Sequence, residues 1–173
     1  MISIESLFRV LLSLFVFGLT ATFVLVGLMS GPFVPTSRRK VSKMLDLARV
    51  KKGETLVDLG AGDGRFVIAA AQRGLHAVGV EKNPFLILWA RCLITFLGLS
   101  KRAQMLRGDL FDHELGDVDV LVVYLFPETN QKLQPKLEKE LKPGARVLTN
   151  TFAFPEWTPI ATDEKEGLFV YQR

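Results

Sequence analysis

A short apolar segment that ends in three closely spaced glycines constrains the fold of this chain more than any other feature. Thr55 to Leu59 has the length and composition of a buried strand, and Gly60, Gly62 and Gly64 follow it at once. Phe66 to Arg73 then shows the spacing of a helix. A strand, a glycine-rich loop and a helix in this order are typical of a doubly wound α/β sheet, which binds its ligand at such a loop.

The residues on either side repeat this alternation. Further strands are expected at 76–80, 103–106, 118–124 and 145–149, and helices at 38–49, 84–98 and 127–141. This order predicts a parallel sheet with right-handed crossovers and helices on both faces. After Thr151 the pattern changes, and 158–163 and 167–171 predict two strands joined by a charged turn. We therefore expect the α/β class, with a doubly wound, mostly parallel, seven-stranded sheet.

An uncharged segment precedes this region. Val10 to Met29 has 20 residues without a charged side chain, and a helix of that length reaches about 30 Å, the thickness of the hydrocarbon core of a bilayer. A cleaved signal peptide is the alternative, but its apolar region is usually shorter. We expect a single transmembrane helix as a membrane anchor over residues 1–30, a linker over 31–37 and a catalytic domain over 38–173.

Basic residues predict how this anchor is oriented. Arg9 stands before it, offset by Glu5, and four basic residues follow it: Arg38, Arg39, Lys40 and Lys43. The positive-inside rule then places the domain on the cytoplasmic side of the membrane. The cluster also favours contact with anionic lipid headgroups, although a basic, solvated helix face is the alternative.

The composition excludes some classes of partner. The net charge of +4 is too small to indicate nucleic acid by itself. The single cysteine, Cys92, and two distant histidines provide neither an intrachain disulfide nor the ligands of a zinc site. We expect no nucleic-acid partner and no metal.

The glycine loop differs from the dinucleotide-binding motif in ways that predict another cofactor. Its spacing is Gly-x-Gly-x-Gly, and Arg65 takes the place of the third glycine of that motif. Asp58 disfavours a pyrophosphate but suits the α-ammonium of a methionyl group. Glu81 follows Gly60 by 21 residues, and a carboxylate there accepts both hydroxyls of a ribose. A bare strand-to-helix turn is the alternative. These features predict an S-adenosylmethionine site.

Two further positions belong to the predicted site. The alkyl stem of Lys82 is placed to cover an adenine ring. Asp109 and Leu110 follow the third strand, where an acid commonly accepts the adenine amino group, but Asp109 as a turn residue is the alternative.

Several segments together resemble one family. They are Val34-Pro35-Thr36, the loop from Val57 to Arg65, Glu81-Lys82-Asn83-Pro84 and Phe154-Pro155-Glu156-Trp157. Over about residues 33–172 the chain resembles the small seven-strand, class I protein-lysine methyltransferases. Mitochondrial members of this family modify the adenine nucleotide translocase and the ATP synthase c-subunit, and archaeal and bacterial relatives have broad specificity. The resemblance implies a Rossmann-like methyltransferase fold. The predicted cofactor-binding residues are Thr36, Asp58, Gly60, Gly62, Asp63, Glu81, Asp109 and Leu110.

The segment after the fourth strand bears on the substrate. Many methyltransferases have Asn/Asp-Pro-Pro-Tyr there to hold a planar nitrogen, whereas this chain has Tyr124-Leu125-Phe126-Pro127. This departure favours an alkyl amine such as lysine. A dry site beside a sulfonium lowers the pKa of that amine by desolvation and like charge. We expect Tyr124 to face the amine. Phe152, Phe154 and Trp157 are expected to line a channel, with capping of the core as the alternative.

These observations order the functional hypotheses. We expect a methyltransferase that acts on lysine ε-amines of membrane-associated proteins, in contact with membrane lipid. A lipid-soluble substrate (a quinone or a lipid headgroup) is a second enzymatic hypothesis, and a non-catalytic S-adenosylmethionine-binding membrane assembly factor is a third. A nicotinamide-dependent oxidoreductase fits Arg65 less well. The helix from Phe85 to Leu97 is apolar almost all round, so its outer face is expected to meet the membrane or the anchor.

Overall fold

A computed structural model describes residues 4–30 and 34–173, except for the side chains of residue 4, residue 19 and residues 21–30. The chain divides into two units, Met1–Val34 and Pro35–Arg173. Each unit is described by itself. Residues 31–33 of the predicted linker lie outside the described part.

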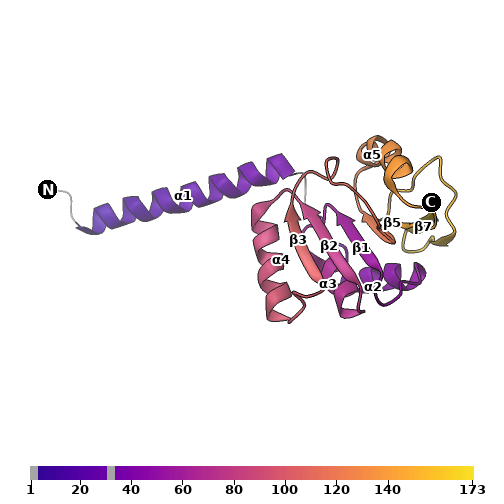
Figure 1. Ribbon diagram of the computed structural model, residues 1–173. Helices are drawn as coiled ribbons and strands as arrows, with labels where there is room; N and C mark the ends of the chain where they lie inside the picture. Colours follow the sequence, from indigo (N-terminus) through magenta and orange to yellow (C-terminus); the bar gives the residue numbers. More distant parts are fainter. Residues whose placement is uncertain (1–3, 31–33) are drawn as a thin grey trace. The chain divides into compact units, whose positions relative to one another are not determined.

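The first unit contains the helix α1 (Ile4–Ser30), which includes the whole segment from Val10 to Met29 (Figure 1). Among the residues that were described, no helix is both long enough and apolar enough to cross a membrane. From residue 21 onward the side chains of the predicted span are not among them. The transmembrane helix stays a prediction.

The second unit is a seven-stranded sheet with helices between its strands (Figure 1). Its elements are α2 (Arg38–Leu47), β1 (Thr55–Leu59), α3 (Arg65–Gln72), β2 (His76–Glu81), α4 (Pro84–Phe96), β3 (Ala103–Arg107), β4 (Val120–Val123), α5 (Pro127–Glu140), β5 (Arg146–Asn150), β6 (Ala161–Asp163) and β7 (Leu168–Gln172). The strand order is β3-β2-β1-β4-β5-β7-β6. Strands β1 to β5 are parallel, and β7 is antiparallel to both β5 and β6. The predicted fold class is confirmed for this unit.

Two strands are shorter than expected. β4 begins at Val120, and the Asp119 carboxylate just before it accepts a hydrogen bond from the Thr55 backbone N–H at 2.8 Å. β6 begins at Ala161, directly after Ile160, whose N–H donates to the Val170 carbonyl at 2.8 Å. The remaining bounds agree with the predicted ones to within about two residues.

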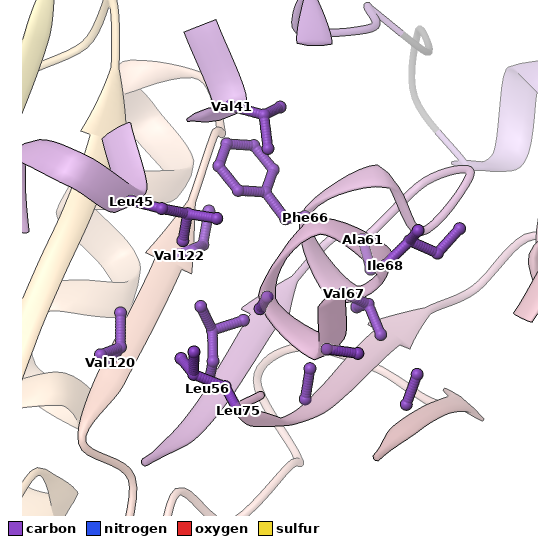
Figure 2. Packing of buried hydrophobic residues seen from close by; sticks show 14 of the residues in the cluster. Val41, Leu45, Leu56, Ala61, Phe66, Val67, Ile68, Leu75, Val120 and Val122 are labelled. Carbon is purple, nitrogen blue, oxygen red and sulfur yellow. The ribbon is translucent and has the colours of Figure 1, made fainter. Parts of the chain in front are cut away.

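Apolar residues fill both faces of the sheet. Figure 2 shows part of the first face, where Phe66 of α3 lies beside Val41 of α2 and Leu56 of β1 lies beside Leu75. The second face includes Leu133 and Leu137 of α5, which belong to one buried cluster with strands β1, β2, β4, β5 and β7. Both clusters consist of residues from the second unit.

One glycine allows α3 to pack closely on the sheet. A Cβ at Gly79, in the middle of β2, would lie 2.6 Å from the sulfur of Met105, 2.7 Å from the Cβ of Ala61 and 2.9 Å from a methyl of Val67. Only a residue without a side chain fits this point. The close packing keeps the glycine loop against the end of β1.

The strand order reverses direction beside β1. β2 and β3 lie on one side of it, and β4 and β5 on the other. A doubly wound sheet binds ligands in the crevice outside the carboxyl ends of its strands at such a switch point. The residues that follow β1, β2, β4 and β5 therefore form the candidate site.

Candidate cofactor and substrate site

The glycine loop after β1 turns as sharply as its sequence predicts. Gly60, Gly62 and Gly64 have φ angles of +82°, +55° and +76°, which L-residues with side chains rarely adopt. The backbone N–H groups of Gly60 and Ala61 both donate to the Val80 carbonyl, at 2.9 and 3.0 Å. A Cβ at Gly64 would lie 2.9 Å from that of Ala90. The loop backbone is thus free to approach a ligand.

Glu81, at the end of β2, fixes the shape of this loop. One carboxylate oxygen accepts from the Gly62 N–H at 2.9 Å. The other accepts from the N–H groups of Lys82 and Asn83, at 3.0 and 2.9 Å. A carboxylate has about four lone-pair positions, so one stays available for a ribose hydroxyl. The bond to the loop was not anticipated from sequence.

Asp58 is a buried carboxylate without a counter-ion. Its exposed fraction is only 4%, and its carboxylate makes no hydrogen bond or ion pair with any residue of the described ranges. Burial raises its pKa to about 8, with further contributions from the negative charges of Glu81 and Asp63. An environment of this kind is stabilised by a cation from outside the chain. The site therefore fits the ammonium group for which Asp58 was singled out.

Arg65 connects the loop to the segment before α2. Its guanidinium forms a bidentate pair with Asp63, at 2.8 and 2.6 Å, and it donates to the Thr36 carbonyl. The Thr36 hydroxyl also accepts from the Asn150 amide, at 3.4 Å. The structure thus brings Thr36 to the loop, and its contact with a cofactor stays a prediction. The Asp63 carboxylate is occupied by Arg65, a partner that sequence did not identify.

Lys82 and Asp109 pair with each other. The Lys82 ammonium lies 2.7 Å from the Asp109 carboxylate, which also accepts from the Phe111 N–H at 3.0 Å. The hydrogen bond from Lys82 is the main reason that the pKa of Asp109 lies below its usual value, and the Phe111 bond adds to it. Leu110 packs partly buried against the second core cluster. Asp109 is therefore both a turn residue and a candidate adenine ligand.

Tyr124 lies at the carboxyl end of β4, half-buried. Its hydroxyl has no hydrogen-bond partner among the residues whose side chains are described. Nearby in sequence, the exposed ring of Phe126 packs against that of Phe152, with centroids 6.1 Å apart. Sequence analysis proposed Tyr124 and Phe152 for the substrate side of the site and did not include Phe126.

Of the other two predicted channel residues, Phe154 belongs to the core and Trp157 packs against it, partly buried. Phe154 is 1% exposed, and its ring centroid lies 4.7 Å from that of Trp157 and 5.7 Å from that of Tyr171. The Trp157 indole N–H donates to Glu138 at 2.9 Å. Their placement corresponds to the alternative interpretation, in which these rings cap the core. The role of Phe152 in a channel stays a prediction.

Asn130 is a candidate site residue that no sequence motif indicated. It is 1% exposed in the first turn of α5, and its amide N–H donates to the Phe152 carbonyl at 3.4 Å. The Thr149 hydroxyl donates to the same carbonyl. The Asn130 side-chain oxygen has no partner within the described part of the chain. Burying an oxygen without a hydrogen-bond partner costs stability. In the sequence, only the position of Asn130 in the segment after β4 pointed to the site.

The comparisons with known proteins agree with this geometry. Residues 58–161 match the family described as the ANTKMT methyltransferase domain. A protein-lysine N-methyltransferase of Saccharolobus islandicus (strain REY15A) is 40% identical over 130 residues, which are 74% of this chain and 81% of that protein. The ATP synthase c-subunit lysine N-methyltransferase of Homo sapiens is 38% identical over 128 residues, 74% of this chain and 54% of that protein. This chain therefore spans about half the length of the human relative.

A solved structure with a bound ligand is similar to this chain as well. It is an RNA methyltransferase from Salinibacter ruber in complex with S-adenosyl-L-homocysteine, with a TM-score of 0.76 and 40% sequence identity. The alignment covers 80% of this chain and 92% of that one. The chain therefore belongs to the family of the ANTKMT methyltransferase domain, and it is a class I, Rossmann-like methyltransferase as its resemblance implies.

Proposed function

We propose that this chain transfers a methyl group from S-adenosylmethionine to lysine ε-amines of proteins at a membrane. One observation carries the proposal: the Saccharolobus protein, named for lysine N-methylation, is 40% identical over 130 residues that make up 81% of its length. The human relative is named for a lysine of the ATP synthase c-subunit. The cofactor is supported by the ligand of the Salinibacter structure.

The residues around the glycine loop fit this cofactor. Bound S-adenosylmethionine supplies a methyl group on a positively charged sulfur. Asp58 accepts from the α-ammonium and is held ionised by it, which removes the cost of burying an unpaired carboxylate. Glu81 keeps its bond to Gly62 and accepts from the ribose with its remaining lone pair. The absence of side chains at the loop glycines lets the backbone follow the cofactor closely.

The residues after β4 and β5 then position the substrate amine. The unpaired hydroxyl of Tyr124 accepts from the amine and directs the nitrogen lone pair toward the methyl group. The pair formed by Phe126 and Phe152 keeps water away from the alkyl chain. A lysine in this dry place, near a sulfonium, loses its proton more readily than its usual pKa of about 10.4 allows. No dedicated base is then required, and positioning supplies most of the catalysis.

RNA is a second candidate substrate, because the Salinibacter protein is named as an RNA methyltransferase. The basic cluster at the start of α2 is a poor phosphate site, since acids of the β6–β7 turn pair with it. Lys43 contacts Asp163, and the side chains of Arg39 and Lys40 lie 3.9 and 4.0 Å from Glu166. Electrostatic binding to RNA requires cations that are free to meet phosphates. The α2 cluster therefore gives RNA little support, and lysine is the favoured substrate because the relatives are named for it.

The experiment that separates these substrates follows the destination of the methyl group. The full chain is incubated with radiolabelled S-adenosylmethionine, native membranes and total RNA, which are then fractionated into protein, RNA and lipid. Lysine methylation predicts label in protein that is lost with Asp58→Ala. Label in RNA would support the second candidate. Label in the lipid extract would support a lipid-soluble substrate instead.

The proposed location depends on the first unit. The uncharged segment from Val10 to Met29 supports a single-pass anchor, and the basic residues that follow it support a cytoplasmic catalytic domain. Sealed vesicles made from expressing cells test both points. An anchored protein resists extraction with alkaline carbonate, and a protease added from the cytoplasmic face removes its catalytic domain. Extraction by carbonate would contradict the anchor.

A further inference from the structure

Helix α4 exposes its largest apolar side chains. Phe85, Leu88, Trp89 and Phe96 are 45%, 61%, 63% and 85% exposed, and Cys92 is exposed among them. At about 100° per residue, these five positions fall within an arc of about 100°. We refer to these five residues as the α4 face.

The packing of the domain does not account for this face. The opposite side of the helix already supplies Ile87, Ala90 and Ile94 to the core. A surface helix ordinarily has polar residues on the side away from the core. Contiguous exposed apolar side chains of this kind mark an interaction site.

Positive charge borders the α4 face. Residues 82–108 include five basic residues and no Asp or Glu: Lys82, Arg91, Lys101, Arg102 and Arg107. Asp109 offsets the charge of Lys82. Arg91 donates to the Met105 carbonyl and Arg102 to the Gly74 carbonyl. Because these acceptors are neutral, they do not cancel the positive charges of the two guanidinium groups. α4 packs on β3, the edge strand of the sheet. This end of the domain is therefore apolar and cationic together.

We propose that the α4 face lies in the headgroup region of an anionic lipid bilayer. With 13 residues α4 is about 20 Å long, too short to span and suited to lie along the surface. Trp and Phe side chains favour the boundary between headgroups and acyl chains, and the bordering cations favour anionic lipid. Two copies of the chain would bring like charges together at this end, which disfavours self-association.

This contact has a consequence for the active site. α4 begins at Pro84, three residues after the Glu81 that ends β2, so Phe85 lies near the cofactor edge of the sheet. A bilayer against the α4 face would hold that edge near the membrane surface, where a lysine projecting from a membrane protein is within reach. This consequence rests on the proposed lysine activity, whereas the lipid contact does not.

The single cysteine provides a direct test. A nitroxide attached to Cys92 of the full chain reports whether oxygen, which dissolves in lipid, or a polar nickel chelate reaches it. With vesicles of phosphatidylcholine and phosphatidylglycerol, oxygen access should rise and nickel access should fall. The matched control is Cys92→Ser/Lys139→Cys, which places the label on the exposed side of α5. It should stay open to nickel even though α1 is present in both proteins.

Two other occupants of the α4 face predict different results. Immobilisation of the label that depends on protein concentration, without vesicles, would indicate a second copy. Protection by RNA without vesicles would indicate nucleic acid. Either result, or a Cys92 label as open to nickel as the control, would overturn the proposal. Quenching of fluorescence by brominated lipid, lost in Trp89→Phe, is the second readout and needs no label.

A pair of variants connects the contact to activity. Leu88→Glu/Phe96→Glu puts two carboxylates on the α4 face, and Thr95→Glu/Gln104→Glu puts the same charge on exposed polar positions beside it. The first pair should lower methylation of a bilayer-embedded protein about fivefold more than the second, with equal rates on a soluble lysine peptide. Equal losses on both substrates, or equal effects of the two pairs, would refute this consequence. If the first pair of substitutions abolishes lipid quenching but the wild-type protein methylates neither substrate, the lipid contact stands and only the proposed function is refuted.

Discussion

Asp58→Asn should stabilise the protein without its cofactor and prevent the cofactor from binding. Burial and nearby carboxylates raise the pKa of Asp58 from its usual 3.8 to about 8. At pH 7 the folded protein then holds a proton that the unfolded chain has released, which costs on the order of 4 kcal/mol of stability. An amide of the same shape has no charge to desolvate, so the variant should gain about 2–4 kcal/mol.

The raised pKa of Asp58 also predicts how the free energy of unfolding changes with pH. Because the folded-state pKa lies above the unfolded one, the stability of the wild-type protein should fall as pH rises from about 4 to about 8, and then level off. Asp58→Asn should flatten this slope. Urea unfolding between pH 5 and pH 9, followed by far-ultraviolet circular dichroism, measures both proteins.

Cofactor binding supplies the opposite half of the prediction. An ammonium beside Asp58 ionises it, so wild-type protein should release about one proton when S-adenosylhomocysteine binds at pH 7. Calorimetry in buffers of different ionisation enthalpy measures this release. Asp58→Asn should bind at least about 100-fold more weakly, as expected when a buried ammonium loses its charged partner. The reasoning is refuted if the variant is less stable than wild type at pH 8, or binds the ligand equally well.

Three further variants test other parts of the site and fold. Gly79→Ala should lower the free energy of unfolding by about 3 kcal/mol, because its Cβ would meet Met105, while Gly108→Ala, with 3.6 Å of space, should cost far less. Arg65→Ala should weaken S-adenosylhomocysteine binding about tenfold by releasing the loop from Thr36, and a normal calorimetric affinity would contradict this role. Tyr124→Phe should keep the wild-type affinity for S-adenosylhomocysteine and lower kcat about tenfold. A wild-type kcat in a steady-state assay would show that the Tyr124 hydroxyl has no role in catalysis.

Sequence predicted the parts of the fold that depend on local pattern. The loop from Gly60 to Gly64 follows directly from its glycines, since side chains rarely permit its φ angles. The sequence also indicated an antiparallel hairpin after Thr151, because a short charged turn joins the two strands predicted there. Together with the rule that doubly wound sheets bind ligands at a switch point, these two features predicted which edge of the sheet holds the cofactor.

What sequence did not predict depends on contacts between distant segments. The acids that pair with the basic cluster of α2 lie more than 100 residues later, on the β6–β7 turn. Phe154 is buried because β7 places Tyr171 against it, and no pattern around Phe154 distinguishes this from a channel. The link from Arg65 to Thr36 depends on where the chain before α2 runs. Long side chains reach partners that only the folded backbone defines.

The most direct test of the central claim identifies the methylated atom. The full chain is incubated with S-adenosylmethionine and native membranes, and the digested membrane proteins are sequenced by tandem mass spectrometry. Asp58→Ala serves as the control for contaminating activity. Wild-type protein should form ε-N-methyl-lysine in membrane-protein peptides, and Asp58→Ala should form none. Methyl groups found only on RNA or lipid, or on lysines to the same extent with Asp58→Ala, would contradict it.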